Sequence, residues 1–212
     1  MKVNEIFYSI QGESSYAGYP CVFVRLTGCN LRCSYCDTRY AYDEGEDCTE
    51  EQVLERIAAY GCSLVEITGG EPLLQPDTPG LISRLLDRGC RVLLETNGSM
   101  NIGSVDRRCV RIVDIKCPSS GEVGRNDEAN LARLSARDEV KFVIGTREDF
   151  DFAAAWLEKI RFSAGDCAVH FSPVEKSLAC DMLAEWILAE HLSVRLGLQL
   201  HKVIWPGSCR GV

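Results

Sequence analysis

The chain has 212 residues, of which 46% are hydrophobic and 25% charged, and it carries a formal net charge of −8 with no run of Lys or Arg. This composition predicts one globular domain and argues against direct binding of nucleic acid, because proteins that hold phosphate backbones normally present a basic stripe. No stretch is apolar enough to span a membrane and residues 1–5 do not begin a signal peptide, so we expect a cytoplasmic protein without membrane attachment.

Eight predicted strands and five predicted helices follow one another along the chain. The strands cover residues 3–10, 21–27, 63–68, 91–96, 110–115, 139–144, 168–172 and 194–200. The helices cover residues 49–60, which open with a capping box at Thr49 and Gln52, and residues 77–88, 126–136, 148–160 and 177–191. Because strands and helices alternate with short loops, we predict a parallel sheet flanked by helices. At 212 residues the chain is short for a closed eight-unit barrel, so the predicted α/β fold is an open, partial β/α barrel.

Three cysteines directly after the second predicted strand form the most informative motif. Cys29, Cys33 and Cys36 have C-x3-C-x2-C spacing. A structural zinc site or a complete iron–sulfur ligand set normally uses four ligands, whereas three thiolates leave one position of a metal group open. The same spacing places three residues on one helix face, so packed core cysteines are the alternative interpretation. Asn30, Ser34 and Asp37 favour a loop over a helix.

The other nine cysteines show no C-x2-C or C-x3-C pair, so a second cluster has no support. Most of them are interpreted as small buried hydrophobic residues in a reducing compartment. They are Cys21, Cys48, Cys62, Cys90, Cys109, Cys117, Cys167, Cys180 and Cys209.

Polar motifs lie at the carboxyl end of one predicted strand after another. They are the cysteine loop, residues 69–72 (GGEP), 97–98 (NG), Asp114 with Lys116, and residues 171–173 (FSP). Ligands bind at this edge of parallel α/β sheets, so we expect the motifs to share one site. Gly69 and Gly70 allow close approach of a ligand, and the Glu71 carboxylate can accept from an ammonium group. Taken alone, the segment is equally compatible with a tight turn before a helix.

Arg25 lies on a largely apolar strand, where a guanidinium group needs an anionic partner. Strand alternation places it on the same face as Phe23 and Thr27. An internal Asp or Glu and the carboxylate of a substrate are both candidate partners, and the sequence leaves this choice open.

Residues 29–36, 68–72, 95–98 and 114–116 together resemble the shared motifs of the radical S-adenosylmethionine (SAM) enzymes. The resemblance implies a 4Fe–4S cluster on Cys29, Cys33 and Cys36, with SAM filling the open iron. Glycyl-radical-activating enzymes have a similar set, so an activating protein is one alternative function. A non-catalytic zinc or electron-transfer module is another.

Three further segments resemble the 7-carboxy-7-deazaguanine synthases: residues 7–13 (FYSIQGE), 36–38 (CDT), and His201-Lys202 with Pro206. The resemblance then spans nearly the whole chain. It implies conversion of 6-carboxy-5,6,7,8-tetrahydropterin to 7-carboxy-7-deazaguanine with loss of ammonia, on the route to queuosine-type bases. It also implies a flavodoxin or ferredoxin electron donor and a homodimer.

The resemblance carries site roles onto individual residues. It implies Mg²⁺ at Thr38, whose hydroxyl oxygen is a suitable hard ligand. Cofactor-binding residues would be Tyr35, Gly70, Glu71, Asn97, Asp114, Lys116, Ser172 and Pro173. Substrate-binding residues would be Ile10, Gln11, Gly12, Arg25, Thr68 and Pro206, with Gln11 meeting the donor–acceptor edge of the pterin and Arg25 its carboxylate. Some relatives end at the proline that matches Pro206, whereas six residues follow it here.

Overall fold

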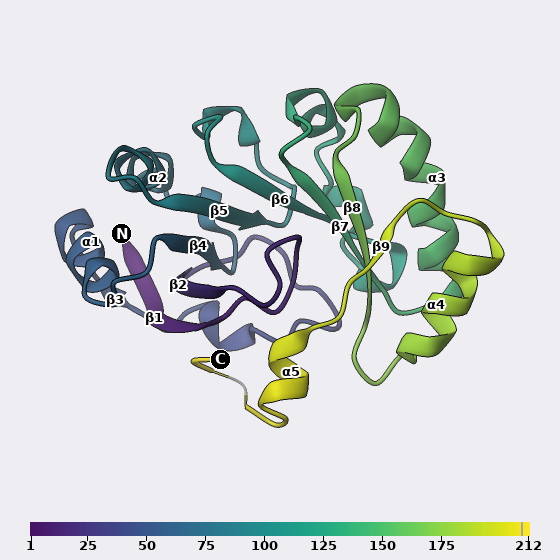
Figure 1. Cartoon of the computed structure of the whole chain (residues 1–212), viewed down its shortest axis with the longest axis horizontal. Coiled ribbons are helices and arrows are strands. Elements are labelled where there is room, and N and C mark those ends of the chain that lie inside the picture. The colour runs from purple at the N-terminus through teal and green to yellow at the C-terminus, as the bar shows by residue number, and fades with distance from the viewer. Residues whose placement is uncertain (209) are drawn as a thin grey trace.

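A computed structural model describes residues 1–208 and 210–212, and its strands form one curved, open sheet (Figure 1). The strand order is β3-β1-β2-β4-β5-β6-β7-β8-β9, so β3 and β9 are the two edges. The strands are β1 Lys2–Ile10, β2 Pro20–Leu26, β3 Glu46–Asp47, β4 Leu64–Gly69, β5 Arg91–Thr96, β6 Val110–Ile115, β7 Glu139–Ile144, β8 Ala168–Pro173 and β9 Arg195–Leu196. The open, partial barrel predicted from the sequence is therefore confirmed.

Helices α1 to α4 lie on the outer side of the sheet, and α5 lies near the opening between β1 and β9 (Figure 1). The helices are α1 Glu50–Ala58, α2 Thr78–Asp87, α3 Arg147–Ala164, α4 Cys180–Ala189 and α5 Leu200–Ile204. The capping box of Thr49 and Gln52 is formed at the start of α1, and α3 begins with a second one. Alternate strand residues such as Val22, Val24 and Leu26 pack outward against the helices, which leaves the next residues to face the interior of the barrel.

The strands from β2 to β9 run parallel, but β1 is antiparallel to both β2 and β3, which differs from the uniform alternation expected. The reason is that residues 11–19 connect β1 to β2 without a helix, and a parallel connection needs a long crossover. This loop therefore lies at the amino edge of the parallel strands, where β1 ends. The amide of Ser15 in the loop donates to the Glu139 carboxylate at the start of β7 (3.0 Å to Oε2), so the loop closes that end of the barrel.

Two predicted elements differ most from what the sequence pattern indicated. The helix expected at 126–136 is a 3-10 helix, Glu128–Arg133, because the buried Asn130 side chain bonds to the backbone of Gly98 and Met100 instead of facing solvent. The strand expected at 194–200 pairs only over Arg195–Leu196, after which Leu200 N donates to Gly12 O (3.0 Å) and α5 begins. Tertiary contacts decided both boundaries.

All eleven described cysteines carry free thiols, and Cys209 lies outside the described residues. Four of the non-motif cysteines, Cys21, Cys109, Cys117 and Cys167, are buried as expected, whereas Cys48, Cys62, Cys90 and Cys180 are half-buried. Within the described part of the chain, no helix is both long and apolar enough to cross a membrane.

Candidate active site

A cavity of about 950 Å³ occupies the interior of the barrel and its carboxyl edge. Every residue to which the sequence analysis assigned a cluster, magnesium, cofactor or substrate role lines it, with the exceptions of Glu71 and Ser172. Ser172 instead lines a neighbouring void of about 10 Å³, beside His170 and Gly197, which has room for about one water molecule. The motifs that follow the parallel strands meet in one place because these strands end at one edge. Ile10, Gln11 and Gly12 reach the cavity from the end of β1 and the loop after it.

The cysteine motif lies in a loop, so the alternative of three core cysteines on one helix face is wrong. The segment after β6 holds this loop in place. Ser34 donates through its amide to Ser120 O (3.0 Å) and through its hydroxyl to Ser119 O (2.7 Å), while Arg39 donates back to Ser34 O (2.8 Å). The loop conformation is therefore fixed by backbone acceptors, and the three thiols need no role in folding it.

The three thiols lie in one loop that lines the cavity. Among the described residues, no group of three or more His, Cys, Asp or Glu side chains is placed to hold a single metal ion. Three thiolates leave one position of a metal group open, so Cys29, Cys33 and Cys36 would suit a 4Fe–4S cluster with one open iron. Burial raises the pKa of Cys29 and of Cys33, and a bound cationic metal group reverses this by binding the thiolates.

The two glycines of the GGEP motif are needed for close backbone approach. A Cβ atom on Gly70 would lie 2.2 Å from Gly28 O and 2.7 Å from Cys29 Cβ, so only glycine fits beside the cysteine loop. Gly69 has φ of +152° and its added Cβ would meet Leu26 O at 2.2 Å. The motif therefore presents its backbone to the cavity next to the first cysteine.

The expectation that Glu71 binds an ammonium group of the cofactor is corrected by the structure. Glu71 is fully buried outside the cavity, and its carboxylate accepts from Thr96 Oγ1 (2.9 Å), Asn97 N (2.7 Å) and Leu73 N (2.9 Å). These bonds tie the turn after β4 to the Asn97-Gly98 turn after β5. Glu71 is thus a positioning residue, because its carboxylate is buried and already accepts hydrogen bonds from three donors.

Asp114 and Lys116 form a buried ion pair on the cavity wall, with 2.7 Å between Lys116 Nζ and Asp114 Oδ2. Burial opposes the charge of Lys116, but Asp114 and Cys33 outweigh it and the pKa of Lys116 is raised. Asp114 Oδ1 and the Tyr35 hydroxyl are buried without a hydrogen-bond partner among the described residues. A buried polar atom without a partner is costly, so these two atoms fit a polar ligand such as SAM in the adjoining cavity.

Arg25 has an internal carboxylate partner, which is one of the two interpretations left open by the sequence. Its Nε donates to Glu5 Oε1 (2.8 Å), and its guanidinium lies against the rings of Phe7 and Tyr40 at 5.9 and 5.8 Å from their centroids. Among the described residues, its two terminal nitrogens make no hydrogen bond, and Arg25 lines the cavity. The internal pair therefore holds the guanidinium in place while its outer edge stays available to a carboxylate.

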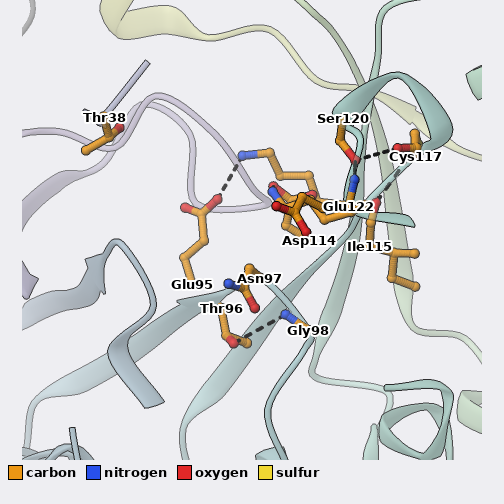
Figure 2. A network of polar contacts seen from close by, with 12 residues as sticks. Thr38, Glu95, Thr96, Asn97, Gly98, Asp114, Ile115, Cys117, Ser120 and Glu122 are labelled. Atoms are coloured by element: carbon orange, nitrogen blue, oxygen red, sulfur yellow. Dashed lines mark hydrogen bonds and ion pairs between the residues drawn. The ribbon is translucent and has the colours of Figure 1, made fainter. Parts of the chain in front are cut away.

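Sequence reasoning missed a group of charged side chains in the floor of the cavity, the amino-edge end of the barrel interior. Lys141 forms ion pairs with Glu13 and with Glu95 (2.8 Å to Oε1), and Glu66 lies with them. Figure 2 shows Glu95 from β5, Asn97 directly after β5 and Asp114 from β6, with Thr38 on a separate segment. A detectable signal was present, since Glu66, Glu95 and Lys141 each interrupt an apolar strand at an inward-facing position, as Arg25 does.

The C-terminal helix closes one side of the site. Gly12 has no room for a Cβ, which would lie 2.3 Å from His201 Nδ1, and Lys202 Nζ pairs with Asp37 Oδ2 (3.0 Å) of the cysteine loop. Thr38 donates to the same carboxylate through Oγ1 (2.9 Å to Oδ1). Pro206 lines the cavity together with Gly207, Ser208 and Val212, so the segment after Pro206 also lies beside the site.

Comparisons with known proteins agree with this geometry. The pattern that describes the Radical SAM superfamily matches residues 23–161. A 7-carboxy-7-deazaguanine synthase of Chlorobaculum tepidum is 46% identical over 100% of this chain and 97% of its own length, and one of Koribacter versatilis is 43% identical over 100% of both. A crystal structure of QueE from Escherichia coli superposes with a TM-score of 0.77 over 93% of each chain at 24% identity, which shows the fold alone.

These matches extend through all of the motifs and favour the synthases over the activating enzymes and the non-catalytic modules. Radical SAM enzymes use a 4Fe–4S cluster and SAM, and the cysteine loop and its surroundings fit both. The chain therefore belongs to the radical SAM superfamily and, within it, to the family of the 7-carboxy-7-deazaguanine synthases.

Proposed function

We propose that this enzyme converts 6-carboxy-5,6,7,8-tetrahydropterin to 7-carboxy-7-deazaguanine with loss of ammonia. The observation that carries the proposal is the full-length match to proteins named for this product, at 46% and 43% identity. The cavity supports it independently, because it offers the free edge of the Arg25 guanidinium for a carboxylate and several buried carboxyl groups for N–H donors. A carboxypterin carries both kinds of group.

Each set of residues then has a distinct task. Cys29, Cys33 and Cys36 hold the cluster, and the wall formed by Tyr35, Asp114 and Lys116 contacts SAM. When bound there, the cluster and SAM would supply the radical chemistry that starts with removal of hydrogen from the substrate. The protein orients the substrate through Arg25 and excludes water by enclosing it inside the barrel.

Gly70, Asn97 and Pro173 complete the cofactor side of the proposed site. Ile10, Gly12, Thr68 and Pro206 line the substrate side. Ser172 acts from behind this wall, since it faces the smaller void. Gln11 also lines the cavity, and its side-chain contacts are considered below.

The remaining assignments also belong to the proposal. Thr38 lines the cavity and its hydroxyl oxygen keeps lone pairs for Mg²⁺, which takes few protein ligands and retains several waters. Residues 1–212 act as one radical SAM domain in the cytoplasm, as a homodimer supplied with electrons by a flavodoxin or ferredoxin. The small-molecule substrate is consistent with a cavity enclosed by the barrel.

The test is anaerobic incubation of cluster-loaded enzyme with 6-carboxy-5,6,7,8-tetrahydropterin, SAM, Mg²⁺ and dithionite, followed by mass analysis. The expected result is 7-carboxy-7-deazaguanine, ammonia and 5′-deoxyadenosine that increase together. Production of 5′-deoxyadenosine at the same rate with and without the pterin, and no deazapurine, would refute the proposed reaction.

A further inference from the structure

Glu66 has an unusual position for a carboxyl group. It lies in the middle of β4 and is only 3% exposed, with the outward-facing Val65 and Ile67 packed in the core on either side of it. Strand alternation turns Glu66 inward together with Thr68, and both line the cavity. A buried carboxyl group needs partners that compensate for lost hydration, so its contacts decide what it does.

Unlike Glu13 and Glu95, Glu66 forms no ion pair with a described residue. Glu13 accepts from Lys141 and from Gln199 Nε2 (2.6 Å), and Glu95 accepts from Lys141 (2.8 Å). Glu66 accepts only from Gln11 Nε2, through Oε2, and no cation of the described residues lies within ion-pair distance. Its Oε1 atom therefore makes no hydrogen bond within the described part of the chain.

Two carboxyl groups and two cations surround Glu66. Glu95 from β5 and Glu13 from the loop after β1 face it, while Lys141 from β7 and Arg25 from β2 offset them only in part, since both are already paired. Burial, followed by Glu95 and Glu13, raises the pKa of Glu66 well above its usual range. Hydrogen bonds donated by a ligand favour the ionised carboxylate and lower this pKa, whereas an anionic group placed there would be repelled.

Gln11, expected to meet the edge of the pterin, also has contacts within the protein. Its Nε2 donates to Glu66 and its Oε1 accepts from Glu13 N (3.0 Å), so both ends of the amide are engaged in a residue that is 4% exposed. An amide fixed at both ends holds its neighbour in one orientation. Gln11 is thus a positioning residue that aims the Glu66 carboxyl group.

We propose that Glu66 determines specificity for the 2-amino-4-oxo ring by accepting hydrogen bonds from the exocyclic amino group and the adjacent ring N–H. This inference rests on the proposed pterin substrate and names the residue that recognises its ring. The register supports the placement, because Phe23 pairs with Glu66 and Arg25 pairs with Thr68 on the neighbouring strand. Arg25 and Glu66 are therefore about 8 Å apart in backbone position, a span comparable to that between the two ends of a bicyclic ring.

The test compares two stable ligands that differ only at ring position 2. The ligand 6-carboxypterin has an amino group there, and 6-carboxylumazine has a carbonyl oxygen. Their dissociation constants are measured by anaerobic equilibrium dialysis against the cluster-loaded enzyme with SAM and Mg²⁺. Wild-type protein should bind the pterin about tenfold to hundredfold more tightly, since a carboxyl group facing a carbonyl leaves buried acceptors without donors.

Glu66→Gln should abolish or reverse this preference, because its amide can donate to the lumazine carbonyl while Gln11 still has an oxygen to which it can donate. The matched control is Glu139→Gln, a buried glutamate beside His170 that does not line the large cavity and should keep the preference. Melting temperatures verify that both variants fold. Wild-type discrimination is also informative on its own, since it requires no variant.

The outcomes separate this inference from the proposed function. If the wild type binds neither ligand, the proposed substrate class fails, and the role of Glu66 fails with it. If both ligands bind but the wild type does not discriminate, or Glu66→Gln keeps the wild-type preference, only the role of Glu66 is overturned. Loss of preference in Glu66→Gln but not in Glu139→Gln supports it.

Discussion

The role of Arg25 gives the most quantitative prediction. Replacing Arg25 alone would leave Glu5 without its cation, with the two side chains only 16% and 17% exposed, and removing one partner of a buried pair typically costs about 3–5 kcal/mol of stability. We therefore take Glu5→Gln as the reference and compare it with the double variant Glu5→Gln/Arg25→Met. Methionine keeps an extended side chain between Phe7 and Tyr40, so the comparison removes the charge and preserves most of the packing.

The expected effect follows from the unpaired terminal nitrogens of Arg25. A desolvated charge pair lost from a binding site costs about 2–5 kcal/mol, which corresponds to a roughly 30-fold to 4,000-fold increase in the dissociation constant. Only the carboxylate of the ligand takes part in this pair. Binding of 6-carboxypterin should therefore weaken by this factor, whereas pterin without the 6-carboxylate should bind both proteins equally.

The measurement is equilibrium dialysis of both ligands against both proteins, which gives a double cycle of residue and ligand group. SAM affinity serves as a control and should be unchanged, because the SAM wall is formed by other residues. Equal weakening for both ligands would show that Arg25 shapes the site without contacting the carboxylate. No weakening for either would refute the assignment.

Three further predictions concern the cluster, the metal and the fold. Cys33→Ala should abolish cluster loading and SAM cleavage while Cys62→Ala keeps both, and a Cys33→Ala protein that still holds about four irons with full activity would contradict the ligand set. Thr38→Ala should blunt the rise in turnover when Mg²⁺ is added to metal-stripped enzyme while SAM binding is unchanged, and an unaltered magnesium response would defeat the assignment. Burial raises the pKa of Asp138, but hydrogen bonds from Arg111 outweigh burial and keep this pKa below 3.8. The pair therefore stabilises the folded protein above pH 3.8, and this stabilisation is lost as the pH falls through the folded-state pKa of Asp138. Arg111→Met should lower the free energy of unfolding at neutral pH by about 3–5 kcal/mol in urea titrations and remove that acid dependence, and a variant as stable as wild type would contradict the pair's role.

The sequence by itself determined the local elements and predicted the metal ligands. Alternating apolar residues defined the central strands, and the Thr49 capping box set the start of α1 within a residue. The three-cysteine spacing and the glycines at 69 and 70 predicted a cluster-binding loop, because ligand spacing and close backbone approach are properties of a few adjacent residues. These signals are local, so no knowledge of the fold was required.

Tertiary structure decided the contacts between distant segments. The sequence could not show that Glu71 accepts hydrogen bonds from Thr96 and Asn97, because these residues lie at the end of β5 and directly after it. It also left open whether Arg25 has an internal partner. The antiparallel pairing of β1 with β2 resolved the second question, because it places Glu5 opposite Arg25.

The floor of the cavity shows the physical reason most clearly. Glu66, Glu95 and Lys141 each lie in a largely apolar strand, and strand alternation indicates only that they face inward. Which carboxyl group is paired depends on distances between strands that the chain connects through 29 or more residues. Lys141 reaches Glu13 and Glu95 and leaves Glu66 to Gln11, and that choice is made by packing, because the energy of a buried charge depends on neighbours that only the folded chain supplies.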